Sequence, residues 1–510
     1  MSAPSIPLLA RAASYGARSA LIVGDERYSY QELLQRSATA AARLLGDRQD
    51  LQGARVAFLT PADLTYAVTK WAIWRAGAIA VPLCTQHPPP ELRHVIRDSG
   101  ASVVIAHPTL AQRLHDVCAE LAIPLQLTDT LMRNSDGEPA RSLSPALPHV
   151  EPERGALILY TSGTTGKPKG VVTTHATLAA QLTAVTTAWE YSPSDHNLLV
   201  LPLHHLHGIL NVLWGTLWAG GVCEMHTQFS ADTVFQRITS VDGPTIFMAV
   251  PTIYAKLIST YDAADDERKT QIRAGCQRLR LMVSGSAALP IPTLEKFRAI
   301  SGHTLLERYG MTEIGMALGN PLHGERRPGH VGQPFPDVEV RVVDEHDQPL
   351  AEGEVGQLQV RGPNVFQSYW NRPQDTTAAF TADHFFRTGD VGVCEQGSYR
   401  ILGRASVDIL KTGGYKVSAL DIEACLRTHP AIADCAVVGV PDPEWGQRVA
   451  ACVMLHADCA LTLEELRMFG KQHLAAYKVP SLLLNVENLP RNAMGKVQKK
   501  AVAALFTPAD

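Results

Sequence analysis

The central part of the chain alternates short apolar runs with amphipathic segments. Apolar runs typical of buried strands occur at residues 198–201, 245–250, 280–283 and 304–306. The segment 294–300 has apolar residues at the spacing that places them on one face of a helix. Strands that alternate with helices indicate an α/β fold with largely parallel sheets.

The pattern changes after about residue 335, where shorter strands with glycine turns are expected at residues 354–361 and 398–402. At 418–421 the sequence Ser-Ala-Leu-Asp is typical of a capping box that opens a helix. We therefore expect an α/β protein with a large N-terminal domain, residues 1–403, which has mostly parallel sheets plus a β-rich lobe. A small, mobile α+β C-terminal domain is expected at residues 404–510.

The N-terminal residues fit a folded segment. A helix is expected from residues 8–13, and a hairpin from residues 19–23 and 28–30 around a Gly24-Asp25 turn, which leaves no disposable leader. The alternative is a transit peptide, because Arg, Ser and Ala precede Asp25 and no acid does.

The longest apolar run, residues 206–223, is interrupted by His207, Asn211 and several glycines. A membrane span needs a longer continuous apolar stretch, so this run predicts a buried helix and turn, and no membrane partner is expected.

Composition narrows the class of protein. A chain of 510 residues with 45% hydrophobic residues can bury more than one core. The formal net charge of -4 gives no general attraction to nucleic acid or anionic membranes. Nine scattered cysteines without a CxxC pair argue against a disulfide framework or a zinc site, so a reducing, cytoplasmic location is expected. The oligomeric state stays open.

The segment YTSGTTGKPKG, residues 160–170, directly follows an apolar strand-like run. Glycines let backbone N–H groups converge on an anion, and lysine and threonine add further donors, so the loop suggests phosphate binding. It is not a Walker A loop, because only two residues separate Gly163 from Gly166 and Pro168 follows Lys167. A flexible turn is the alternative for this loop taken alone.

Five further segments accompany the loop in a fixed order. They are PLHHLHG (202–208), ERYGMTE (307–313), FRTGD (386–390), GR (403–404) and PRNAMGK (490–496). Together the six resemble the adenylate-forming superfamily, which includes acyl-CoA synthetases, luciferase and peptide-synthetase adenylation domains, over nearly the whole chain. The resemblance implies that a carboxylate attacks ATP to give an acyl-adenylate and pyrophosphate, after which coenzyme A displaces AMP. It implies ATP, Mg²⁺ and coenzyme A as participants.

The resemblance also implies roles for individual residues. Lys496 would bridge the carboxylate and the α-phosphate, Thr312 would contact that phosphate, and Glu313 would hold Mg²⁺, a cation suited to oxygen ligands. His205 would lie beside the acyl pocket. The residues expected to hold the nucleotide are Thr161, Ser162, Gly163, Thr164, Thr165, Gly166, Lys167, Ser284, Tyr309, Asp390 and Arg404.

Three of these residues have simpler interpretations when taken without the motifs. Lys496 would be a solvated lysine of a basic tail, Asp390 a turn residue, and His205 a hydrogen-bonded core histidine.

Arg308 bears on the choice of acid. Relatives that take aromatic or fatty acids commonly have glycine at this place, and a buried, unpaired guanidinium is costly, so Arg308 predicts a substrate with a second negative charge. Residues 202–208, 281–290 and 304–322 closely resemble malonyl-CoA synthetases. His207 and Lys256 are expected to help hold the distal carboxylate, and Ser286 lies in the small-residue segment beside the pocket. An internal salt bridge of Arg308 with Glu307 or Glu325 is the alternative.

The sequence leaves open the hinge residue, the acyl acceptor and the choice between malonate and methylmalonate. The hinge segment 403–414 is one residue longer than usual in the family, so Asp408 is the expected pivot and Val407 the next choice. The acyl acceptor is expected to be free coenzyme A, with a carrier protein in trans as the alternative, and either malonate or methylmalonate would fit. A nucleotide-binding regulator with an inactive site is disfavoured because Lys496 and Glu313 are both present.

Overall fold

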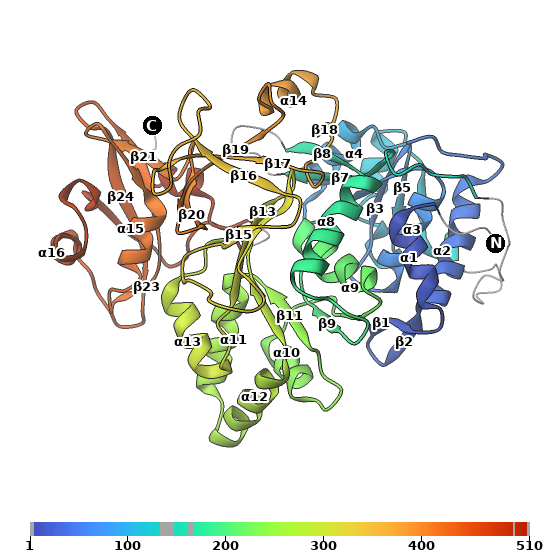
Figure 1. The fold of residues 1–510 in the computed structure, drawn as a ribbon, viewed down its shortest axis with the longest axis horizontal. Helices are drawn as coiled ribbons and strands as arrows, with labels where there is room; N and C mark the ends of the chain where they lie inside the picture. Colours follow the sequence, from blue (N-terminus) through green and yellow to red (C-terminus); the bar gives the residue numbers. More distant parts are fainter. Residues whose placement is uncertain (1–4, 133–146, 162–167, 493–494, 507–510) are drawn as a thin grey trace.

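A computed structural model describes residues 5–132, 147–161, 168–492 and 495–506 (Figure 1). The predicted N-terminal helix and hairpin are confirmed as α1 (Pro7–Tyr15), β1 (Ser19–Val23) and β2 (Glu26–Ser29), with β1 and β2 antiparallel. Leu9 and Leu21 are fully buried, so both elements contribute to the core.

A seven-stranded sheet lies in the N-terminal half, in the order β18-β8-β7-β4-β3-β5-β6. The strands from β7 to β6 pair in parallel, whereas β8 is antiparallel to β7 and to β18. The phosphate-loop segment therefore joins two neighbouring antiparallel strands. The bounds are β3 Arg55–Leu59, β4 Ile79–Pro82, β5 Val103–Ala106, β6 Leu125–Leu127, β7 Gly155–Thr161, β8 Lys169–Thr174 and β18 Ser368–Tyr369.

A nine-stranded sheet follows the order β15-β14-β13-β12-β11-β9-β10-β1-β2. Its centre, from β13 to β1, is parallel, and it contains the four strands expected from the apolar runs. The bounds are β9 His196–Leu199, β10 Val222–Met225, β11 Ile246–Ala249, β12 Leu281–Ser284, β13 Leu306–Met311, β14 Gly315–Gly319 and β15 Gln333–Pro334.

Helices cover both sheets, and α8 contacts β8 of the first sheet and β14 of the second. The run 206–223 forms two buried helical segments and a turn, as predicted, and its last residues begin β10, which was not predicted. No helix in the described ranges is long and apolar enough to span a membrane. The helices are α2 Tyr30–Leu45, α3 Leu64–Arg75, α4 Pro89–Ser99, α5 Pro108–Ala111, α6 His115–Glu120, α7 Thr128–Met132, α8 His175–Ala188, η1 His207–Trp214, α9 Gly215–Trp218, α10 Ala231–Thr239, α11 Pro251–Ala263, α12 Asp266–Arg278, α13 Ile291–Ser301 and α14 Pro373–Ala379.

The β-rich lobe is a four-stranded antiparallel sheet in the order β16-β17-β19-β20. It lies in the middle of the molecule, between the strands of the N-terminal half and the C-terminal part (Figure 1). Its strands are β16 Glu339–Val343, β17 Gly356–Arg361, β19 Phe386–Glu395 and β20 Ser398–Arg404.

The C-terminal part has its own sheet and its own buried clusters. Ser418 caps α15 by accepting a hydrogen bond from the Asp421 N–H, as the sequence pattern indicated. The predicted α/β fold with a β-rich lobe and an α+β C-terminal part is confirmed. The elements are β21 Ile409–Thr412, β22 Tyr415–Ser418, α15 Ala419–Leu426, β23 Ile432–Asp442, β24 Gly446–Leu455, α16 Leu463–His473, η2 Ala476–Lys478, β25 Leu482–Asn485 and α17 Lys499–Ala504.

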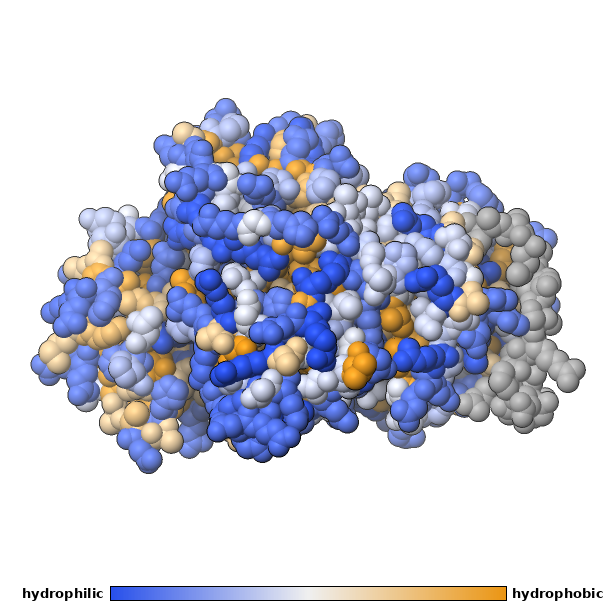
Figure 2. Space-filling view, turned by 60° about the horizontal axis from the view of Figure 1, so that its bottom comes forward, coloured by the Kyte–Doolittle hydropathy of each residue, from blue (hydrophilic) through white to orange (hydrophobic). Residues whose placement is uncertain are grey.

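The face of the molecule in Figure 2 is mainly hydrophilic, and its apolar residues form separate, small patches. Scattered exposed apolar residues are normal for a folded protein surface, so this face gives no sign of a broad apolar contact.

Candidate active site

Arg308 lies on β13 and is buried, with 6% of its surface exposed. Its Nη2 donates a hydrogen bond to Ser286 Oγ at 3.2 Å, and the same hydroxyl lies 3.2 Å from His207 Nδ1. The structure therefore brings together three of the four predicted substrate residues, although they come from β13, the turn after β12 and the start of η1.

Arg308 makes no ion pair within the described ranges, and its Nε is buried without a hydrogen-bond partner there. Glu307 instead accepts a hydrogen bond from the Gly329 N–H, and Glu325 is exposed, so the salt-bridge alternative is not formed. Burial lowers the pKa of Arg308 to about 9. The side chain is thus a buried cation whose only described hydrogen-bond partner is a neutral hydroxyl.

The turn after β12 leaves room for the Arg308 side chain. A Cβ atom at Gly285 would lie only 2.3 Å from Arg308 Nε, so a larger residue could not occupy the position without moving the guanidinium. The next residue, Ser286, has a φ of 70°, in the left-handed region that side-chain-bearing residues seldom adopt. Ser286 has this backbone conformation while its hydroxyl contacts both Arg308 and His207.

The other two residues predicted near the acyl pocket make no described hydrogen bond with this cluster. Lys256 is an exposed residue of α11 whose ammonium lies 5.8 Å from the centre of the Phe229 ring, and no contact with Arg308 is seen in the described chain. His205 packs against His204 with ring centroids 3.9 Å apart. Burial lowers the pKa of His205 to about 4, so its imidazole is neutral at neutral pH.

Asp390 and Tyr309 form a second group, on the other side of β13. Tyr309 donates to Asp390 Oδ2 at 2.6 Å, and Arg404 Nε lies 3.2 Å from Asp390 Oδ1. Asp390 and Arg404 are paired in register on β19 and β20. Burial raises the pKa of Asp390, and the charges of Arg404 and Lys496 and the Tyr309 hydrogen bond oppose that rise. Three predicted nucleotide-binding residues are therefore in contact.

Glu313 and Thr312 lie in the turn between β13 and β14. Burial raises the pKa of Glu313, and its Oε1 accepts a hydrogen bond from Tyr369 at 3.0 Å. No pattern in the sequence pointed to Tyr369, which lies on the short strand β18. Ser284 ends β12, and its hydroxyl is buried with no described hydrogen-bond partner.

Lys496 belongs to the C-terminal part, yet its charge acts on Asp390 of the β-rich lobe. The neighbouring Gly495 lies against α11, where an added Cβ would be 3.4 Å from Thr252 Oγ1. The loop that carries Lys496 thus approaches the N-terminal half. The backbone N–H of Lys496 donates to Asn492 Oδ1 at 3.0 Å.

Thr161 ends β7 and pairs in register with Lys169 of β8. The other predicted phosphate-loop residues, Ser162, Gly163, Thr164, Thr165, Gly166 and Lys167, lie outside the described residues.

Comparison with known protein families identifies the family of this chain. Residues 8–370 match the family described as AMP-binding enzyme, and residues 421–496 match the AMP-binding enzyme C-terminal domain. The chain belongs to the AMP-binding enzyme family. The predicted resemblance to adenylate-forming enzymes is thereby confirmed.

Individual relatives cover nearly the whole chain. The chain is 46% identical to mouse (Mus musculus) "Malonate--CoA ligase ACSF3, mitochondrial", over 99% of this chain and 91% of that protein. ATP-bound MatB from Rhodopseudomonas palustris is 32% identical, with a TM-score of 0.89 over 99% of both chains. A malonyl-CoA ligase product complex with methylmalonyl-CoA and AMP is 35% identical, with a TM-score of 0.68 over 95% of this chain and 100% of that chain.

These relatives correct one prediction. A cytoplasmic location was expected from the free cysteines, but the mouse relative is named as mitochondrial, so that prediction is wrong. Unpaired cysteines indicate a reducing compartment and do not by themselves distinguish one reducing compartment from another.

Proposed function

We propose that this AMP-binding enzyme is an ATP-dependent malonate–CoA ligase. It converts malonate, ATP and coenzyme A into malonyl-CoA, AMP and pyrophosphate through a malonyl-adenylate. The mouse relative named as a malonate–CoA ligase and the similar MatB structure support this function. Methylmalonate is a second candidate acid, because one similar structure contains methylmalonyl-CoA.

The observation that carries the choice of acid is the buried, unpaired charge of Arg308. A cation that the fold removes from water without an acidic partner is costly, and a bound carboxylate offsets that cost. Malonate has one carboxylate to be activated and a second one free to meet Arg308. Ser286 and His207 add hydrogen-bonding groups at the same place. An uncharged short acid would leave the guanidinium unpaired.

The second group of residues, Tyr309, Asp390 and Arg404, is suited to bind the nucleotide. Asp390 is already oriented by Tyr309 and Arg404, and a carboxylate held in this way can accept hydrogen bonds from both ribose hydroxyls. The Tyr309 ring would lie against the adenine. Thr161 and the residues 162–167 would hold the β- and γ-phosphates, and Ser284 lies at the strand end between the two groups.

Glu313 fits a magnesium ligand. Tyr369 occupies one oxygen of its buried carboxylate, which leaves the other oxygen available, and Mg²⁺ prefers carboxylate and phosphate oxygens. When bound, Mg²⁺ would neutralise part of the negative charge of the phosphates. Thr312, in the same turn, would donate its hydroxyl to the α-phosphate.

Lys496 would act in the first chemical step. Attack of the malonate carboxylate on the α-phosphorus increases negative charge on the phosphate oxygens, and a fixed cation between carboxylate and phosphate stabilises that charge. The approach of the Lys496 loop to α11 and the effect of its charge on Asp390 both support this position. His205, neutral beside the acyl pocket, would help to place the carboxylate.

The proposal includes two domains, residues 1–403 and 404–510, that move relative to each other during the reaction. The change of sheet between β20 and β21 supports this boundary. The contacts of Asp408 support its proposed role as the hinge residue. Its carboxylate accepts a hydrogen bond from the Arg404 N–H and lies 3.5 Å from Lys499 Nζ. The TM-score is 0.89 with the ATP-bound structure and 0.68 with the product complex, as expected if the arrangement of domains differs between steps.

The decisive experiment is pyrophosphate release with a panel of mono- and dicarboxylic acids, followed by analysis of the thioester product. Malonate or methylmalonate should be preferred strongly over butyrate and acetate. Supplying coenzyme A and a carrier protein in separate reactions tests the acceptor. A preference for uncharged acids would refute the proposal.

A further inference from the structure

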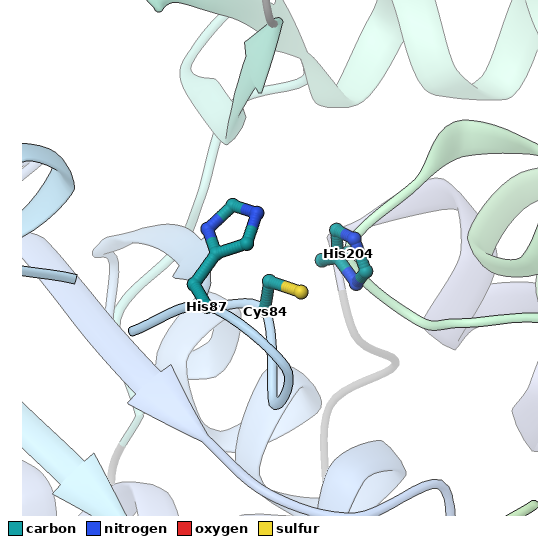
Figure 3. A group of neighbouring side chains, drawn as sticks. All are labelled: Cys84, His87 and His204. Carbon is teal, nitrogen blue, oxygen red and sulfur yellow. The ribbon is translucent and has the colours of Figure 1, made fainter. Parts of the chain in front are cut away.

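Three side chains that the ligase reaction does not use face one another near the acyl-pocket segment (Figure 3). Cys84 and His87 lie in the turn that follows β4, and His204 lies just before η1. The Cys84 thiol and one ring nitrogen of each histidine all lie within 4.8 Å of one another. Cys84 and His87 are three residues apart, but His204 is distant in the sequence, so a search for CxxC pairs could not reveal the cluster.

The donor set selects a class of ligand. A thiolate with two imidazoles suits zinc and similar transition-metal ions, whereas Mg²⁺ and Ca²⁺ prefer oxygen ligands. In a tetrahedral zinc site, bonds of about 2.0–2.3 Å leave ligand atoms roughly 3.3–3.7 Å apart. The donor atoms would therefore need to approach one another by up to about 1.5 Å, which side-chain rotation can supply.

The surroundings leave the donor atoms of His204 and Cys84 available. His204 Nε2 is buried and has no hydrogen-bond partner in the described ranges. The hydrogen bond described for the Cys84 sulfur comes from the Gln86 N–H at 3.4 Å. A buried ring nitrogen without a partner is costly, and a metal bond would remove that cost.

Neighbouring residues hold the turn and add charge. Arg113 Nη2 donates to the His87 carbonyl at 2.6 Å, which fixes the backbone of the turn. The partly exposed Glu91 carboxylate lies 3.3 Å from His87 Nε2 and brings a negative charge to the outer side of the cluster. Cys84, His87 and His204 would supply three ligands, and Glu91 or water would supply the fourth ligand of a four-coordinate site.

We propose that Cys84, His87 and His204 form a binding site for a zinc-class divalent ion. The Cys84 thiol would lose its proton to solvent when the metal binds. Because the His204 ring packs on His205, the ion would also restrain the segment beside the acyl pocket and slow the ligase. This second step rests on the proposed function, whereas metal binding itself does not.

The first experiment measures binding to the full chain without any substrate. After treatment with a chelator, the protein is titrated with Co²⁺, and thiolate-to-cobalt charge-transfer absorption is recorded before displacement by Zn²⁺. One equivalent of metal should produce the band. Cys84→Ser should abolish it, and His87→Gln should weaken Zn²⁺ binding by about tenfold or more.

Matched controls separate this site from surface binding. Cys118→Ser removes another buried cysteine, and His323→Gln removes an exposed histidine, so both variants should bind Zn²⁺ like the parent chain. Absence of the cobalt band in the parent chain, or equal Zn²⁺ affinity in Cys84→Ser, would mean an adventitious ion only and would overturn the site.

The second experiment measures malonate-dependent pyrophosphate release with and without one equivalent of Zn²⁺. The rate should fall in the parent chain, recover after a chelator is added, and stay unchanged by Zn²⁺ in Cys84→Ser. An unchanged rate in the zinc-loaded parent chain would overturn the restraint of the His205 segment. Lack of malonate activity in the metal-free chain would count against the proposed function and would leave the binding result intact.

Discussion

The acyl and nucleotide regions hold buried charges in opposite ways, although both are built around β13. Arg308, on the acyl side, has a neutral hydroxyl as its described partner. Asp390, on the nucleotide side, is met by both the Tyr309 hydroxyl and the Arg404 guanidinium. A charge without an internal counter-charge fits a charged ligand, and a charge already held by partners fits a ligand that brings only hydrogen-bond donors.

Lys70 differs from Arg308 and shows where this comparison does not apply. Its side chain is fully buried and its ammonium has no hydrogen-bond partner in the described chain. The ammonium instead lies 5.0 Å from the Trp74 ring centre and 5.1 Å from that of Trp214. Aromatic faces attract cations but offer no hydrogen-bonding group to a ligand. A buried basic side chain without an ionic partner therefore indicates a ligand only when polar groups accompany it, as Ser286 and His207 accompany Arg308.

Arg308→Gly should give the largest effect, on the acyl side alone. Removing one partner of a desolvated charge pair costs about 2–5 kcal/mol, or roughly 30- to several thousand-fold in kcat/KM for malonate. Activity with butyrate should fall less, or rise, because the variant has more room and no unpaired cation. Steady-state kinetics with both acids, at varied ATP, measure the ratio.

Arg308→Lys is the matched control for that prediction. It keeps the charge and loses the planar fork, so its malonate activity should lie between those of the parent chain and the glycine variant. Equal losses for malonate and butyrate in a folded Arg308→Gly variant would make Arg308 structural and remove the main physical support for a dicarboxylate.

Lys496→Ala should come next and should affect both acids alike. Loss of a cation that stabilises the transition state costs about 10²–10³ in rate, here in adenylate formation. Thioester formation from supplied malonyl-adenylate should be largely preserved, because the C-terminal domain presents another face in that step. Rapid-quench measurement of each half-reaction, with Lys500→Ala as control, tests this. A comparable loss in both half-reactions would show that the assigned role is wrong.

Asp390→Ala should have a smaller effect, confined to the nucleotide side. The charge-assisted hydrogen bonds to the ribose are lost and water replaces part of their free energy, so a net loss of about 1.5–3 kcal/mol should raise the KM for ATP by about ten- to a hundredfold. The preference for malonate over butyrate should not change. Asp390→Asn, which keeps a hydrogen-bonding side chain, should lose less. If ATP dependence is unaltered in the folded alanine variant, Asp390 does not belong to the nucleotide site.

Lys70→Met should change stability rather than activity. Burial sets the pKa of Lys70 well below its usual range. Between that lowered pKa and the ordinary pKa of lysine, the unfolded chain binds more protons, so the stability of the parent chain rises with pH. The Lys70→Met variant lacks a buried amine that has no described hydrogen bond and that costs about 1–3 kcal/mol. Its free energy of unfolding should exceed that of the parent chain by more at pH 6 than at pH 9. Chemical denaturation at both pH values measures the difference, and a destabilised methionine variant at pH 6 would contradict it.

Much of the fold could be predicted because local patterns define it. The apolar runs become β9, β11, β12 and β13, and the hairpin at Ser19–Val23 forms as expected. Motif spacing also predicted that Asp390 and Arg404 lie close together, and they pair in register, while their role toward the nucleotide stays a prediction. The C-terminal domain boundary and its movement stay predictions.

The rest depends on contacts between distant segments, which no local pattern records. Sequence alone could not show that Arg308 makes no ion pair among the described residues, that Ser286 joins it to His207, or that Lys256 makes no described contact with that cluster. The link between Tyr369 and Glu313 was likewise invisible.

The close approach of Gly285 to Arg308 has a consequence for the history of such enzymes. Because a methyl group at position 285 would collide with the guanidinium, the two positions are not free to vary separately. A side chain acquired at 285 would displace the guanidinium of Arg308 from Ser286 and so weaken the preference that we propose for a doubly charged acid. Once the arginine is lost, side chains that hinder its return are tolerated at 285, so a change of substrate at this site would act as an evolutionary ratchet.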